Sequence, residues 1–190
     1  MGLDSVELLF RIEKEFHIEI SDEKASQMFT IAEFTDTISK MKNVSVKESA
    51  AVQERFQKIS LTIMEIFSLQ EIRPDDKISL LFTSSSQNEW VQLKEKLNDQ
   101  LPAPSFRNTQ SKILNTLFFR KPNYDWNLLT VKDFIEGVLI FNFYDFVNFS
   151  QPQSKEEIYY GIAGLISKTM DIDVFEIKPW KRITTDLGIH

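Results

Sequence analysis

The spacing of apolar residues constrains this chain most strongly. Between positions 4 and 16, apolar side chains recur three or four positions apart, at Val6, Leu9, Ile12 and Phe16, which is the period of one helix face. Similar spacing predicts further helices over residues 22–29, 30–41, 52–66, 90–97, 113–119, 130–139 and 158–169. No long stretch alternates polar and apolar residues as a half-buried strand would. We therefore predict an all-α fold.

Capping residues indicate where three of these helices begin. Asp4 is a good N-cap residue and Glu7 follows three positions later, as in a capping box, so the first helix is predicted to begin at Asp4. Ser21 and Asp22 are predicted to start a short helix, and Thr30 a longer one that ends near position 41.

Two short segments of the sequence occur twice, in the same order. Residues 30–34 read Thr-Ile-Ala-Glu-Phe and residues 130–134 read Thr-Val-Lys-Asp-Phe. Residues 71–74 read Glu-Ile-Arg-Pro and residues 176–179 read Glu-Ile-Lys-Pro, and each of these two segments follows a long predicted helix. Repetition in a fixed order predicts two similar helical units.

Composition excludes several classes of protein. The chain has no cysteine, which excludes disulfides, thiolate metal sites and a cysteine nucleophile. A net charge of −6 without a lysine or arginine cluster is unfavourable for nucleic acid. The longest apolar stretch, residues 137–149, contains three polar residues and is shorter than the roughly 20 residues of a membrane span. We expect no membrane span, no signal peptide and a cytoplasmic location.

The two ends of the chain carry complementary pieces of one motif. It opens Met-Gly-Leu-Asp-Ser-Val-Glu-Leu and closes Asp-Leu-Gly-Ile-His at residues 186–190. Read from tail to head, this run resembles the attachment loop of acyl carrier proteins, in which a serine after an aspartate carries 4'-phosphopantetheine at the start of the second helix. Residues 3–41 resemble the family from that serine onward, and residues 155–189 resemble its first helix and loop. The resemblance implies a circular permutation.

The resemblance also implies two four-helix-bundle domains. The first, residues 1–47 plus 151–190, would be an acyl-carrier-like bundle built from both ends of the chain. Neither piece should fold alone, because about 40 residues bury too little surface to offset chain entropy. Residues 48–150 would form a second, degenerate carrier-like domain. Residues 82–86 read Phe-Thr-Ser-Ser-Ser where Asp-Ser is expected, so we predict no prosthetic group there.

Ser5 is the attachment residue that the resemblance implies, with Asp4 supporting the reaction. A phosphopantetheinyl transferase would attach 4'-phosphopantetheine, and thioester-bound acyl groups would then be presented to acyl-processing enzymes. A serine in the first helical turn is expected to be exposed, where unpaired amides would stabilise a phosphodiester. Acidic residues of the same helix are expected to meet basic partner surfaces; they are Glu7, Glu13, Glu15 and Glu19.

Three hypotheses follow from this pattern. The chain is an acyl carrier protein of a fatty-acid, polyketide or related pathway; or it is an unmodified carrier-like adaptor that binds synthase enzymes; or its ends do not pair within one chain, as in a domain-swapped dimer or a cut-out of tandem carriers. An enzyme is not expected, because no metal cluster or catalytic triad is recognisable and the two histidines, His17 and His190, lie far apart in sequence.

Overall fold

The computed structural model describes residues 2–102 and 124–189. Within these ranges the chain forms helices, turns and loops, with two isolated bridges in place of strands, so the predicted all-α fold is confirmed for this part. The predicted helix over residues 113–119 lies outside the described residues. The helices are α1 (Leu3–Phe16), α2 (Asp22–Ala25), α3 (Ile31–Met41), α4 (Ala50–Phe67), α5 (Gln87–Leu97), α7 (Val131–Phe141) and α8 (Lys155–Met170). Short 3-10 segments are η1 (Ile78–Leu80), η3 (Phe143–Asp145) and η4 (Val174–Glu176).

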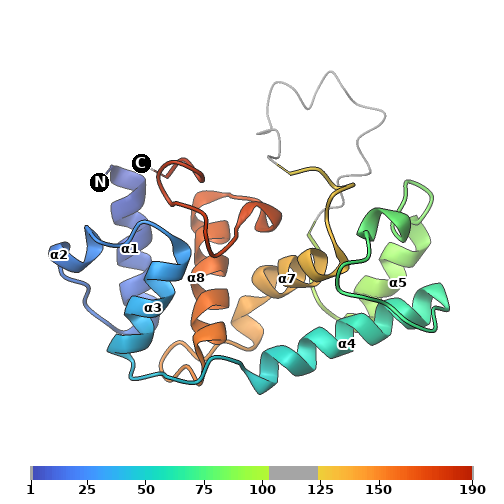
Figure 1. Ribbon diagram of the computed structural model, residues 1–190, viewed down its shortest axis with the longest axis horizontal. Coiled ribbons are helices and arrows are strands. Elements are labelled where there is room, and N and C mark those ends of the chain that lie inside the picture. The colour runs from blue at the N-terminus through green and yellow to red at the C-terminus, as the bar shows by residue number, and fades with distance from the viewer. Residues whose placement is uncertain (1, 103–123, 190) are drawn as a thin grey trace.

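The helices pack in two groups. In the first group, α1 and α3 from the head of the chain pack against α8 from its tail. In the second group, α4 packs against α5 and α7. Figure 1 shows the groups beside each other, with α7 between them, and α7 also packs against α8 and η4. Among the described residues, no helix is both long enough and apolar enough to cross a membrane.

The repeated segments occupy equivalent places in the two groups. The amide of Ala32, at the start of α3, donates to the carbonyl of Pro179 at 2.8 Å, and the amide of Lys132, at the start of α7, donates to the carbonyl of Pro74 at 2.9 Å. An isolated antiparallel bridge accompanies each contact; the two bridges are Thr30–Arg182 and Lys77–Thr130. The same joint, between a helix start and a proline-containing loop, is therefore built twice.

Capping explains why both helices at this joint start where they do. Thr30 and Glu33 form a reciprocal capping box at α3, and Thr130 and Asp133 form another at α7. Each box satisfies amides that have no partner within the helix. The predicted starts of both helices are confirmed. By contrast, α2 ends at Ala25, four residues earlier than predicted, because the chain turns after it.

A shared apolar core joins the two groups. Phe175, after α8, lies against α7 at Gly137, where an added Cβ would overlap its ring. The same ring meets Trp126 edge-on, with centroids 6.1 Å apart, and stacks near Phe134. Glycine at position 137 therefore allows a side chain of the first group to pack into the second.

Candidate functional site

The structure places Ser5 on the buried face of α1. Its side chain shares a face with Leu8, Ile12 and Phe16, and the residue is only 8% exposed. Its hydroxyl donates to the carbonyl of Gly2 at 2.9 Å. The expected exposure of Ser5 is therefore wrong. The hydroxyl is hydrogen-bonded within its own helix and lies against the core of the first group.

The start of α1 explains this placement. The helix begins at Leu3 with Gly2 as its N-cap residue, and no side chain caps it. Asp4 and Glu7 lie inside the helix, so the predicted cap and capping box are wrong. Asp4 is exposed in the first turn, where a carboxylate interacts favourably with the helix dipole. Ser5 is the third residue of α1 and lies three positions before Leu8, so it shares the face of the helix that meets the core.

The loop at the tail of the chain lies near the same end of the first group. Figure 1 marks both chain ends at one end of α1 and α8. Gly188 has a positive φ of 69°, a conformation that glycine adopts without strain, and the Ile189 amide donates to the carbonyl of Ile183 at 3.1 Å. A backbone hydrogen bond from Arg182 lowers the pKa of Asp186. His190 lies outside the described residues.

Two of the four expected acidic contact residues are engaged within the protein. Glu13 accepts a hydrogen bond from the Ile20 amide at 2.6 Å. Glu15 pairs with Arg11 at 3.0 Å and is half-buried. These two carboxylates therefore support the fold around the end of α1.

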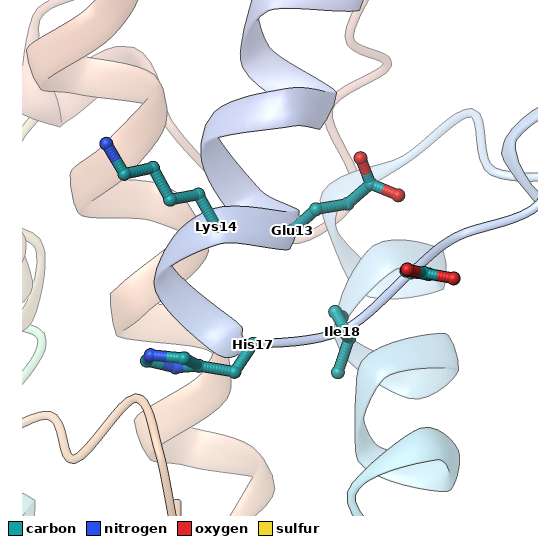
Figure 2. A pocket seen from close by; sticks show the side chains of 5 residues that line it. Glu13, Lys14, His17 and Ile18 are labelled. Carbon is teal, nitrogen blue, oxygen red and sulfur yellow. The ribbon is translucent and has the colours of Figure 1, made fainter.

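The other two expected acidic residues, Glu7 and Glu19, are exposed. Glu7 lies on the outer side of α1, and Glu19 follows the helix and lines a shallow, open depression. Figure 2 shows that Lys14 and Glu13 leave α1 on opposite sides above this depression, with His17 at the end of the helix. The depression combines both signs of charge and is open to solvent, unlike the enclosed pockets that hold small ligands.

An apolar stripe on the outer face of α1 is the feature that sequence reasoning missed. Leu3 is 82% exposed, Val6 51% and Phe10 65%, and their spacing of three and four places them on one face. We define these three residues as the α1 stripe. The sequence interpretation placed Val6 on the same helix face as Ile12 and Phe16, which are buried. The sequence contains a signal for this stripe, because the apolar residues of α1 occupy more than one face. Leu8 and Phe10 lie outside the single face that the predicted period describes.

The second group contains a close counterpart of α1 without this stripe. Helix α5 follows a buried serine, Ser86, and both helices end in a left-handed residue, His17 in α1 and Asn98 in α5. When the two helices are aligned by these serines and by their last residues, the α1 stripe corresponds to three residues of the second group: Ser84, Gln87 and Val91. Two of these three are polar. The exposed apolar face is therefore a property of α1 and not of the shared framework.

In the part of the chain that the structure describes, no cluster of three or more histidine, aspartate or glutamate residues is arranged to hold a metal ion. Comparisons with known proteins found no matching family model, no similar curated protein and no similar solved structure. The proposals below therefore rest on the residues and their geometry.

Proposed function

We propose that this protein is a non-enzymatic, carrier-like adaptor that binds partner proteins through α1. The exposure of the α1 stripe carries this proposal. Large apolar side chains placed together on an exposed helix face are typical of interaction sites. Burying them in a partner would remove apolar area from water, which is the main favourable contribution to association.

The fold part of the proposal is a circularly permuted acyl-carrier-like bundle. In this interpretation α8 takes the place of the family's first helix, and α1, α2 and α3 follow it. The packing of α1 and α3 on α8 supports it, as does the position of both chain ends at one end of the bundle. Residues 1–47 plus 151–190 would form this unit and residues 48–150 its degenerate counterpart, packed together through α7. We propose a monomer, in which these contacts form within one chain, with a domain-swapped dimer as the alternative.

Charge indicates the kind of partner surface. Asp4 and Glu7 are exposed in the first two turns of α1, beside the α1 stripe. Lys14 is the exposed basic residue of the last turn. An apolar cleft with lysine or arginine near the start of α1 would complement this arrangement, and such complementarity accelerates association and selects the partner. Synthase-type enzymes with a basic rim are the proposed class.

Binding to purified fatty-acid and polyketide synthase enzymes would test this function. We expect Phe10→Glu to weaken the interaction at least tenfold, because it places a charge in the apolar contact, equivalent to about 1.4 kcal/mol or more. The matched control is Val91→Glu, at the corresponding position of α5, which should leave binding unchanged. Ser5→Ala should also leave it unchanged. Equal affinity of Phe10→Glu and the parent chain would overturn the proposal.

A second candidate function is that of an acyl carrier with 4'-phosphopantetheine on Ser5. Ser5 lies in the first turn of α1, and helix ends open more easily than helix centres. Its hydroxyl has one hydrogen bond, to Gly2, that such opening would break. Modification would therefore require the first turn of α1 to unwind and expose the serine to a transferase, with Asp4 beside it.

Mass spectrometry would separate this candidate from the adaptor. The chain would be incubated with coenzyme A and a promiscuous phosphopantetheinyl transferase. A mass gain equal to phosphopantetheine that disappears in Ser5→Ala, and persists in Ser86→Ala, would support the carrier. No gain, or a gain that survives Ser5→Ala, would exclude Ser5 as the attachment site while leaving the adaptor function intact.

A further inference from the structure

Residues 143–150 follow α7 and contact both terminal segments of the chain. We define them as the strap. The strap begins at η3, where the ring of Phe143 lies against Gly164 of α8, at a point where an added Cβ would overlap the ring. Phe143 is 3% exposed. The middle of the chain is therefore packed directly onto the tail helix.

The other end of the strap packs onto the head helix. Phe149 meets Phe16 of α1 edge-on, with ring centroids 4.9 Å apart. Both rings converge on Gly161 of α8, where an added Cβ would lie 3.0 Å from Phe16 and 3.1 Å from Phe149. Helix α1, the strap and α8 thus meet at one glycine. Aromatic pairs of this geometry stabilise a fold by more than the burial of their surface alone.

A polar contact joins the same three segments. The Tyr144 hydroxyl accepts a hydrogen bond from Arg11 at 3.3 Å and donates one to Glu15 at 3.2 Å, both on α1. The ammonium nitrogen of Lys168, on α8, lies 4.6 Å from the centre of the Tyr144 ring. One side chain of the strap therefore contacts α1 through its hydroxyl and α8 through its ring.

We infer that the strap fastens α1 to α8, and that holding the two terminal segments together is a role of the middle of the chain. A head segment and a tail segment too small to fold separately need contacts that offset the entropy of bringing them together. The strap supplies such contacts to both at once. This inference does not depend on which molecule binds to α1.

Hydrogen exchange of the full-length chain tests the strap. In Phe149→Ala we expect the amides of α1 to exchange at least about tenfold faster, because the variant removes the aromatic contact to Phe16 and so lowers the free energy of local opening. The amides of α5 should change much less. The matched control is Phe146→Ala: this strap ring contacts Arg55 of α4 and Tyr160 of α8, and its loss should change α1 exchange less than Phe149→Ala does.

A milder variant covers the case in which Phe149→Ala does not fold. Tyr144→Phe keeps the ring beside Lys168 and removes only the hydroxyl that binds Arg11 and Glu15. We expect a two- to threefold increase in the exchange of the last turns of α1, roughly 0.5 kcal/mol, as for a partly exposed hydrogen bond. Unchanged α1 exchange in the folded variants, or equal acceleration in α1 and α5, would overturn the inference.

Discussion

Helices α1 and α5 are built on the same plan and present different surfaces. Aligned from Ser5 and Ser86, the buried residues Ile12 and Phe16 of α1 correspond to the buried residues Leu93 and Leu97 of α5. The exposed positions differ in two of three cases: Leu3 and Val6 of α1 correspond to the polar Ser84, just before α5, and Gln87 of α5. In the third case Phe10 corresponds to Val91, which is smaller and also exposed. Charges also differ, since Glu13 and Glu15 of α1 correspond to Lys94 and Lys96 of α5.

The contrast separates what the framework needs from what is particular to α1. Buried positions are constrained by packing, so a second copy of the framework retains them. Exposed positions have no such constraint, and a large apolar residue such as Phe10 gains nothing there from the fold itself. The outer face of α1 is therefore where a function of the first group is best sought.

The largest expected effect comes from truncating the matched core residues. Ile12 and Leu93 are both fully buried, so Ile12→Ala and Leu93→Ala should each lower the free energy of unfolding by about 2–5 kcal/mol. Because α7 packs on both groups, we expect one cooperative transition in chemical denaturation that shifts in both variants. Two transitions, each shifted by only one variant, would show that the groups unfold independently.

Removing the matched N-caps should have a smaller effect. The Thr30 hydroxyl accepts from the Glu33 amide at 3.2 Å, and the Thr130 hydroxyl accepts from the Asp133 amide at 3.1 Å. Thr30→Ala and Thr130→Ala should each cost about 1 kcal/mol. Equilibrium urea denaturation would measure both. A loss at one cap only would mean that the two joints are equivalent in geometry and different in energy.

The acidic partners in these caps predict a dependence on pH. Hydrogen bonds from the amides of Phe29 and Thr30 lower the pKa of Glu33 below its ordinary value of 4.5. Burial opposes the shift at Asp133, and hydrogen bonds from Lys178 and Thr130 still lower its pKa below 3.8. Between the lowered pKa of the folded protein and the ordinary pKa, the unfolded chain therefore binds more protons than the folded chain. The stabilisation from each carboxylate is present above its ordinary pKa and is lost as pH falls through its pKa in the folded protein.

Urea midpoints between neutral pH and about pH 3 would measure this dependence across the ordinary carboxyl range. In Glu33→Gln and Asp133→Asn, the free energy of unfolding should fall less steeply than in the parent chain as the pH is lowered. The effect should be smaller than that of deleting a cap, because Glu33 is largely solvated and its interactions are screened. An unchanged acid slope in both variants would contradict the assignment.

Local signals were sufficient to predict much of the helical framework. The start of α3 follows from Thr30 and Glu33, whose side chain and backbone satisfy each other within four residues. The repeated segments predicted two similar helical units, and the structure places the prolines of one repeat, at positions 74 and 179, at equivalent joints. The capping boxes depend only on neighbours in sequence, so tertiary packing did not override them. Each proline joint, by contrast, links residues far apart in the chain, such as Ala32 and Pro179.

Features set by packing could not be predicted in the same way. The rotation of α1 depends on which of its two apolar sides meets α8, and Val6 and Leu8 satisfy a helical period equally well. The exposure of Ser5 was predicted incorrectly for the same reason. The strap was not predicted either, because the contact between Phe16 and Phe149 joins distant parts of the chain and no local pattern marks it.

The smallest expected difference is between the two matched serines, and it tests whether their hydroxyls do the same work. The Ser86 hydroxyl accepts from the Thr83 amide at 3.1 Å and donates to the Leu81 carbonyl at 2.9 Å, so it holds the turn before α5. Ser86→Ala should cost about 1 kcal/mol. The Ser5 hydroxyl donates to the Gly2 carbonyl, which also accepts from the Val6 amide at 3.3 Å.

That carbonyl therefore keeps a partner without the Ser5 hydroxyl, and alanine favours the helix more than serine does. Ser5→Ala should change the free energy of unfolding by less than about 0.5 kcal/mol. Denaturation of both variants in parallel would measure the difference. A cost at Ser5 equal to that at Ser86 would show that the Ser5 hydroxyl holds the first turn of α1 closed, which would also weaken the case for its modification.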